Sequence, residues 1–138
     1  MKEVPFGAAG GEPRRILLAE DDAILQRIVT HILTQHGFHV VIANDGEEAI
    51  DQVKTRRPDA IILDAMMPGM DGLEFLHEIR KDTVTRDIPV MMLSVRNLEK
   101  DLVNGFDMGA NDYLVKPFKP EDLVARLKRL LNTAQQRG

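Results

Sequence analysis

Five short, uninterrupted apolar runs recur along the chain and constrain its fold more than any other feature. They lie at Ile16–Ala19, Val40–Ala43, Ala60–Leu63, Val90–Leu93 and Tyr113–Val115. Runs without polar alternation are typical of strands that are buried on both faces, as in a parallel sheet. We therefore expect a parallel sheet that is covered on both sides.

Segments with helical periodicity separate these runs. Apolar residues from Ile24 to Leu33 form one wide stripe that ends before Gly37, while Asp45 and Pro120 suit the starts of later helices. Apolar spacing predicts two more helices, marked by Leu73, Leu76, Ile79, Leu98, Leu102 and Phe106. Five strands alternating with five helices predict an α/β fold, a flavodoxin-like doubly wound parallel sheet of order 2-1-3-4-5.

Composition limits the class of protein. The 138 residues are 43% hydrophobic, which suits one domain, predicted at 14–134 between short tails at 1–13 and 135–138. The absence of cysteine excludes disulfides and thiolate metal sites. A net charge of −4 gives no basic field for direct nucleic-acid or membrane binding, and no apolar stretch is long enough to span a bilayer. We predict a cytoplasmic protein.

Polar residues follow four of the apolar runs, at the point where each strand is expected to end. Glu20–Asp22 follow the first run, Asp64 the third, Ser94 the fourth and Lys116 the fifth. The carboxyl ends of parallel strands meet at one edge of the sheet, which is where such folds place their sites. An ionised carboxylate such as Asp64 costs several kcal/mol at the end of a buried strand unless a cation or donors hold it.

The chemistry of this set points to phosphoryl transfer. Neighbouring strands lie about 4.8 Å apart, so carboxylates on the first and third strands repel unless a divalent cation lies between them. Hard oxygen ligands in an open site favour Mg²⁺, with Mn²⁺ as a substitute. Lys116 supplies an ammonium and Ser94 a hydroxyl, so the group can stabilise a phosphoryl group on Asp64.

The chain resembles the receiver domain of two-component response regulators, of the chemotaxis-regulator type. The resemblance covers roughly Arg14 to Leu131. It rests on four motifs in this order: Ile16–Asp22, Leu63–Gly72, Ser94 and Gly109–Phe118. It implies a signalling switch that catalyses only its own phosphorylation and slow dephosphorylation, and not an enzyme with an external substrate.

The resemblance also implies roles for the acidic residues. Asp64 would take the phosphoryl group from a sensor histidine kinase or a histidine phosphotransfer protein. Asp21 and Asp64 would ligate Mg²⁺ directly, Glu20 would act through water, and Met66 would contribute its backbone carbonyl.

Further residues are implied in phosphoryl binding and switching. Ser94 and Lys116 would bind the phosphoryl oxygens, and Tyr113 would turn inward. Phosphoryl binding and the turn of Tyr113 would reshape the face made by the fourth helix, fifth strand and fifth helix, where a downstream protein would bind. The bond between Lys116 and Pro117 is expected to be cis.

Three residues at the rim of the site prompt a hypothesis about phosphoryl lifetime. Met66 stands where polar residues are frequent in the family, Val95 stands where smaller residues are common, and Arg96 faces the same opening. We expect Met66 and Val95 to narrow the access of water and so to lengthen the lifetime of the phosphoryl group.

Charges of both signs on the switching face suggest a phosphorylation-dependent homodimer. They are Glu99, Lys100, Asp101, Asp112, Arg126 and Arg129. Exposed ion pairs are individually weak, so this prediction depends on their acting together.

Other interpretations stay open at this stage. The chain is either a receiver that acts by docking or the receiver portion of a longer regulator with an output domain. An aspartyl phosphatase of the haloacid dehalogenase class is less favoured, because that class places its nucleophile on the first strand, whereas Asp64 follows the third. A flavodoxin-like phosphate binder is disfavoured because Glu20–Asp22 would repel the phosphate. A receiver that is never phosphorylated is disfavoured because the acidic residues and the lysine that phosphorylation needs are all present. Asp22 alone can be a helix cap, and Tyr113 can be packing.

Overall fold

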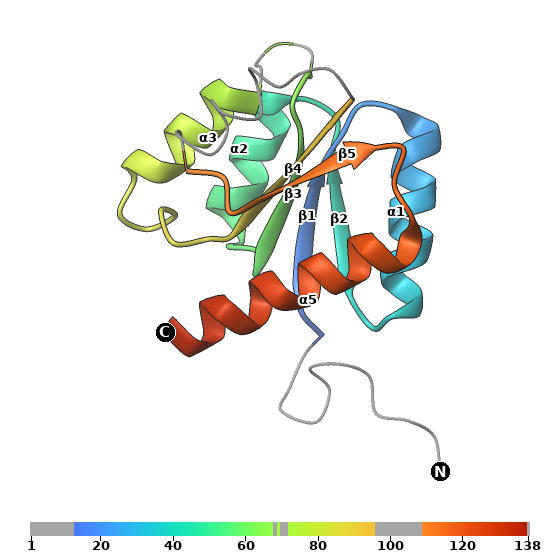
Figure 1. Cartoon of the computed structure of the whole chain (residues 1–138). Helices are drawn as coiled ribbons and strands as arrows, with labels where there is room; N and C mark the ends of the chain where they lie inside the picture. The colour runs from blue at the N-terminus through green and yellow to red at the C-terminus, as the bar shows by residue number, and fades with distance from the viewer. Residues whose placement is uncertain (1–12, 68, 70–71, 96–108, 138) are drawn as a thin grey trace.

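The computed structural model describes residues 13–67, 69, 72–95 and 109–137 (Figure 1). Five strands form one sheet: β1 Arg15–Ala19, β2 His39–Ala43, β3 Ala60–Asp64, β4 Val90–Val95 and β5 Asp112–Lys116. The helices of the described residues are α1 Ala23–Gln35, α2 Gly46–Thr55, α3 Gly72–Lys81 and α5 Pro120–Arg137. The helix expected around Leu98, Leu102 and Phe106 lies outside the described residues.

The sheet is parallel throughout and has the order β2-β1-β3-β4-β5, so the predicted topology is confirmed. Leu17 lies opposite both Val41 and Ile61, and Leu63 lies opposite Met92. This register brings the carboxyl ends of β1 and β3 side by side, which positions the site described below.

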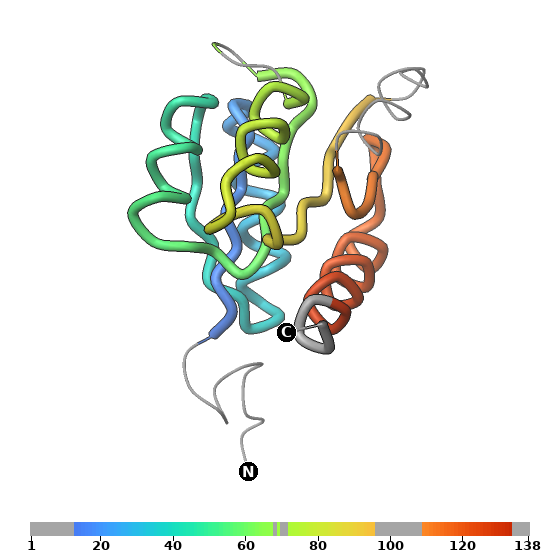
Figure 2. Tube along the Cα trace, turned by 90° about the vertical axis from the view of Figure 1, so that its left-hand side faces the viewer, coloured from blue at the N-terminus to red at the C-terminus, as the bar shows by residue number. Residues whose placement is uncertain are grey.

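Helices cover both faces of the sheet (Figures 1 and 2). Ile16 and Leu18 point into a cluster with the apolar sides of α1 and α5, and Leu17 and Ala19 point into a second cluster with α2 and α3. The alternation follows from the period of two along a strand. Because both faces are buried, the strands read as continuous apolar runs.

Local signals in the sequence account for the ends of α1. Asp22 Oδ1 accepts hydrogen bonds from the amides of Ile24 at 2.9 Å and Leu25 at 3.3 Å, so Asp22 does cap this helix. At the other end Gly37 has a φ of 87°, a conformation that favours glycine. The Phe38 amide returns to the Leu33 carbonyl at 3.1 Å, which completes the expected glycine cap.

Among the described residues, no helix combines the length and the apolar character that crossing a membrane requires. Helix α5 continues to Arg137. The domain boundaries at 14–134 and the cytoplasmic location stay predictions.

One guanidinium joins the end of α3 to the segment that enters β5. Arg80 Nε donates to the Gly109 carbonyl at 2.9 Å, and Nη2 donates to Asn111 Oδ1 at 2.7 Å. Arg80 Nη1 donates to the carbonyls of Arg86 at 2.8 Å and Ile88 at 2.7 Å. Four acceptors would lose a charged donor if this side chain were removed.

We expect Arg80→Met to lower the free energy of unfolding by about 3 kcal/mol, because methionine cannot make the hydrogen bonds that the charged guanidinium donates to these four acceptors. Urea unfolding followed by circular dichroism measures the change. Lys81→Met is the matched control: Lys81 is 58% exposed and pairs only with the exposed Glu78 among the described residues, so its loss should cost under about 0.5 kcal/mol. An equal decrease in the free energy of unfolding of both variants would contradict the role given to Arg80.

Candidate phosphoryl-acceptor site

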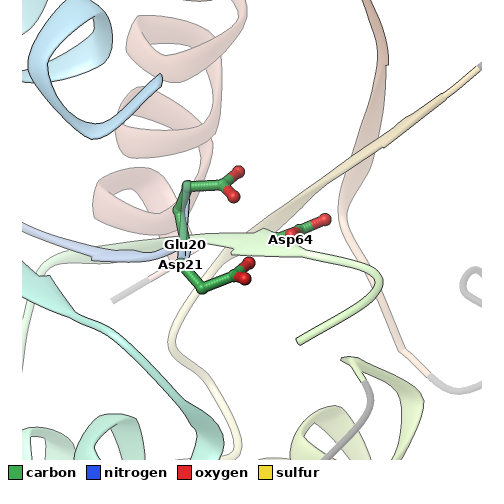
Figure 3. Close-up of side chains that lie close together, drawn as sticks. All are labelled: Glu20, Asp21 and Asp64. Carbon is green, nitrogen blue, oxygen red and sulfur yellow. The ribbon is translucent and has the colours of Figure 1, made fainter. Parts of the chain in front are cut away.

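Three carboxylates gather at the carboxyl ends of β1 and β3 (Figure 3). Glu20 and Asp21 follow β1 directly, and Asp64 is the last residue of β3. One carboxylate oxygen from each lies within 4.8 Å of the other two. Figure 3 shows the three side chains pointing toward the same space. The predicted convergence of these residues is therefore present in the fold.

The three carboxylates differ in burial. Glu20 is 1% exposed and Asp64 is 6% exposed, whereas Asp21 is exposed. Backbone hydrogen bonds fix the buried pair: the Glu20 amide donates to the Ala43 carbonyl at 3.1 Å, and the Met66 amide donates to Asp64 Oδ1 at 3.2 Å. A buried carboxylate that is held by donors is preorganised to interact with a ligand at the open side of the site.

Lys116 supplies the counter-charge from β5. Its Nζ lies 3.2 Å from Glu20 Oε1 and 3.4 Å from Asp64 Oδ1. The sequence analysis expected Lys116 at the same edge of the sheet as Asp64, as the structure has it, whereas the contact with Glu20 was not foreseen. One ammonium thus bridges two strands of the acidic cluster.

The acidic cluster carries more negative charge than Lys116 balances. Burial raises the pKa of Glu20, and the nearby charge of Asp64 raises it further, against the opposing effects of the Asp22 amide and Lys116. A cation next to these oxygens would lower the cost of keeping them ionised. The candidate ligand atoms are all carboxylate oxygens, on two buried residues and one exposed residue, and such hard ligands fit Mg²⁺. No described contact places the Met66 carbonyl, so its part as a ligand stays a prediction.

Ser94 lies on β4, the strand next to that of Asp64, and Tyr113 lies on β5, one strand further along the sheet. Ser94 comes one residue after Leu93, the partner of Asp64 in the sheet register, and is 3% exposed. Its Oγ donates to the Val95 carbonyl at 3.3 Å. Tyr113 is 7% exposed and belongs to the core cluster with α2 and α3. This burial suits both the packing interpretation and an inward position, so the switching roles of Ser94 and Tyr113 stay predictions.

The expected rim residues and the cis peptide bond are located as follows. Met66 is 66% exposed and Val95 is 55% exposed, as rim positions require, while Arg96 lies outside the described residues. The peptide bond between Lys116 and Pro117 is cis, which confirms the expectation.

Two further residues shape the site through contacts that the sequence analysis did not foresee. Gln26 Nε2 donates to the Glu20 carbonyl and to Asn44 Oδ1, so α1 and the end of β2 hold the loop that carries Glu20 and Asp21. Gly72 packs so closely that a Cβ there would lie 2.9 Å from the Ala65 Cα. Gly72 therefore permits α3 to begin against the Asp64 loop. Only the tertiary arrangement shows either contact.

Part of the expected dimer surface is paired within the chain. Asp112 Oδ1 lies 2.8 Å from Arg126 Nη1, and Asp112 Oδ2 lies 3.2 Å from Arg129 Nη2. Arg126 Nε also lies 3.1 Å from Asp122 Oδ1. The pairs of Asp112 join β5 to α5 within one chain. The other proposed charges, at 99–101, lie outside the described residues.

A family model described as the response regulator receiver domain matches residues 16–128. The chain belongs to the response regulator receiver family. The matched region holds all the predicted site residues, from Glu20 to Pro117. The assignment agrees with the resemblance drawn from the motifs.

Individual relatives agree with this assignment. The chain is 45% identical to the Phosphate regulon transcriptional regulatory protein PhoB of Escherichia coli over 118 residues, covering 86% of this chain and 52% of PhoB. It is 42% identical to the response regulator MprA of Mycolicibacterium vanbaalenii over 119 residues, covering 86% of this chain and 51% of MprA. The receiver thus spans about half the length of these relatives.

Solved structures show the same fold. The chemotaxis response regulator CheY4 of Vibrio cholerae matches with a TM-score of 0.81 and 34% identity, covering 86% of this chain and 98% of CheY4. The receiver domain of a histidine kinase from Syntrophus aciditrophicus matches with a TM-score of 0.82 and 33% identity, covering 87% of this chain and 91% of that domain. The match to CheY4 supports the chemotaxis-regulator-like description.

The relatives also correct one prediction. Net charge led us to exclude direct nucleic-acid binding, yet PhoB is a transcriptional regulatory protein and this chain covers only half of it. Charge in one domain carries no information about another domain. The exclusion therefore does not extend beyond the residues of this receiver.

Proposed function

We propose that Asp64 accepts a phosphoryl group from a histidine kinase or a histidine phosphotransfer protein in the presence of Mg²⁺. The observation that carries the proposal is the position of the Asp64 carboxylate. One of its oxygens lies within 4.8 Å of an oxygen of Glu20 and one of Asp21, and the Lys116 ammonium lies 3.4 Å from Asp64 Oδ1. Negative oxygens, a cation site and a fixed ammonium around one nucleophile are what phosphoryl transfer requires.

The transfer follows from the chemistry of the two side chains. An oxygen of Asp64 attacks the phosphorus of the donor phosphohistidine, the P–N bond breaks, and the imidazole leaves with the electron pair and takes up a proton. Lys116 Nζ, which now contacts two carboxylates, can turn to a phosphoryl oxygen as charge develops there. The buried Ser94 hydroxyl on the neighbouring strand is the proposed second donor.

Mg²⁺ would be held by Asp21 and Asp64 directly, by Glu20 through water and by the Met66 carbonyl. When bound, the ion supplies charge neutralisation for the phosphoryl oxygens. Glu20 Oε1 already contacts Lys116 at 3.2 Å, so we propose that this residue orients the ammonium as well. Mn²⁺ presents the same preference for oxygen ligands and is the proposed substitute.

An exposed apolar pair beside the site is a suitable surface for the donor. Ile24 is 70% exposed and Ile28 is 47% exposed, and they lie four residues apart on the same side of α1. This helix begins just after Asp21, so a protein docked on the pair would reach the carboxylates. A helical phosphotransfer domain or histidine kinase fits such a surface by packing an apolar helix side against it.

We propose two ways in which the phosphorylated receiver acts. In the first, phosphorylation changes the face that includes β5 and α5, and a downstream protein binds there. In the second, the receiver acts together with an output domain, a form favoured by the coverage of only about half of PhoB and MprA. A phosphorylation-dependent homodimer is compatible with either.

Incubation with acetyl phosphate and Mg²⁺ tests the central assignment. Intact-mass measurement should show one added phosphoryl group on the natural sequence and none on Asp64→Asn, because the amide is a poor nucleophile. Asp22→Asn is the matched control, since Asp22 caps α1 and asparagine caps equally well. Full modification of Asp64→Asn would refute the assignment.

A second prediction concerns phosphoryl lifetime. Met66→Asn and Val95→Ala should each speed the loss of the phosphoryl group several-fold, because a smaller or polar rim residue admits water to the acyl phosphate. Decay is followed by mass after removal of the donor. Val84→Ala is the control, because Val84 is 69% exposed and lies before β4, at the opposite end of that strand from Val95. Decay rates equal to that of the natural sequence in both rim variants would exclude the hypothesis.

A further inference from the structure

A hollow of about 580 Å³ opens at the end of the sheet opposite the carboxylates. It lies where β1 begins, at the lower end of the sheet in Figure 1. Its lining consists mainly of cationic side chains from the amino ends of three strands: Pro13, Arg14, Arg15, His39, Arg56, Arg57 and Asp59. The proposed phosphorylation chemistry uses none of these residues.

The lining concentrates positive charge in an acidic chain. Counted over the described lining residues, four arginines and one aspartate give a formal charge of +3 with His39 neutral, whereas the whole chain carries −4. A concave surface with charge of one sign focuses the field and attracts counter-ions. Anions are therefore the ligands that this hollow favours.

The backbone framework of the hollow is fixed by hydrogen bonds between strand starts. The Arg15 amide donates to Asp59 Oδ2 at 2.7 Å, and the Asp59 amide donates back to the Arg15 carbonyl at 2.8 Å. The His39 amide donates to the Arg14 carbonyl at 2.9 Å. Asp59, the carboxylate among the described lining residues, is thus engaged with the backbone, and hydrogen bonds tie the strand starts that carry the lining together.

One donor in the wall of the hollow is unsatisfied. Arg15 Nε is buried and has no hydrogen-bond partner among the residues that the structure describes. Burial lowers the pKa of Arg15 and the adjacent charge of Arg56 lowers it further, while Asp59 opposes them. The repulsion between these like charges is a cost that a bound anion would relieve.

We propose that this hollow binds an oligophosphate, either free or as the phosphate chain of a nucleotide. The planar guanidinium pairs with phosphate oxygens through two parallel hydrogen bonds, so an arginine cluster selects phosphate over simple halide ions. The volume falls within the usual range for small-molecule sites, about 300–1,000 Å³. Arg15 and Glu20 are five residues apart along an extended segment, about 16 Å, so the two sites are separate.

Calorimetric titration tests the proposal. The probes are pyrophosphate, ATP and orthophosphate, in buffer with EDTA and 0.15 M salt so that divalent metal at the Asp64 site takes no part. Pyrophosphate and ATP should bind saturably at one site per chain, and orthophosphate more weakly. Tighter binding of ATP identifies a nucleotide as the occupant, and equal binding identifies a free oligophosphate. Absence of saturable binding by both pyrophosphate and ATP would overturn the proposal.

Variants locate the binding in the hollow. Arg56→Gln should weaken pyrophosphate binding about tenfold, because it removes one charged donor. Arg27→Gln, which removes an exposed arginine from α1, should leave the affinity unchanged. An equal loss of pyrophosphate affinity in both variants would show that the chain attracts the anion through its overall charge, and this would overturn the proposal. Arg56→Gln should still be phosphorylated by acetyl phosphate, so the two proposals fail or succeed separately.

Discussion

Asp21→Asn is expected to lower the affinity for Mg²⁺ at least about 100-fold without unfolding the chain. Asp21 is the exposed member of the carboxylate cluster, and it lies in the loop between β1 and α1. Removing its charge takes away a proposed direct ligand but leaves the sheet and the buried contacts of Glu20 intact. Calorimetric titration with MgCl₂ measures the affinity.

The neighbouring aspartate is a sharp control for this prediction. Asp22→Asn removes the same charge one residue away and preserves the cap of α1, so its affinity for Mg²⁺ should change only slightly. Equal losses in Asp21→Asn and Asp22→Asn would mean that general charge, and not ligation by Asp21, attracts the ion. That result would contradict the proposed metal site.

Lys116→Met is expected to slow phosphorylation by acetyl phosphate about 100-fold, the usual cost of removing a preorganised donor from developing negative charge. Lys116 Nζ lies 3.4 Å from Asp64 Oδ1 and 3.2 Å from Glu20 Oε1. Without it the two carboxylates repel each other and the incoming phosphate lacks its cation. The rate is followed by intact mass at saturating Mg²⁺.

A second lysine controls for the loss of positive charge near the site. Lys119 lies three residues after Lys116 and is exposed, so Lys119→Met should be phosphorylated at the same rate as the natural sequence. Lys116→Met should remain folded by circular dichroism, because methionine retains most of the packing of the lysine stem. A folded Lys116→Met that is phosphorylated at the normal rate would remove Lys116 from the mechanism.

The sheet could be predicted from the sequence because its central strands β1, β3 and β4 are buried on both faces. Burial on two faces gives an uninterrupted apolar run, and alternation with helices leaves few topologies for a parallel sheet. The caps at Asp22 and Gly37 were equally local signals. The Arg80 network was not predictable, since its acceptors are backbone carbonyls brought together only by the folded loops.

The core of the site was predictable for a related reason. Glu20, Asp21 and Asp64 converge because each follows the end of a strand and the register aligns those ends. The contact between Lys116 and Glu20 depends on how one long side chain extends across two strands, which no local pattern specifies. The pairing of Asp112 with arginines of its own chain was not foreseen for the same reason, and the homodimer stays a prediction.

The most direct measurement is the chemical location of the phosphoryl group. Borohydride reduces an aspartyl phosphate to homoserine and leaves ordinary aspartate unchanged, so peptide mass mapping after phosphorylation identifies the acceptor. The account predicts homoserine at position 64, formed only with Mg²⁺ present and absent from Asp64→Asn. Homoserine at Asp21 or Asp22, with an unmodified Asp64, would contradict it.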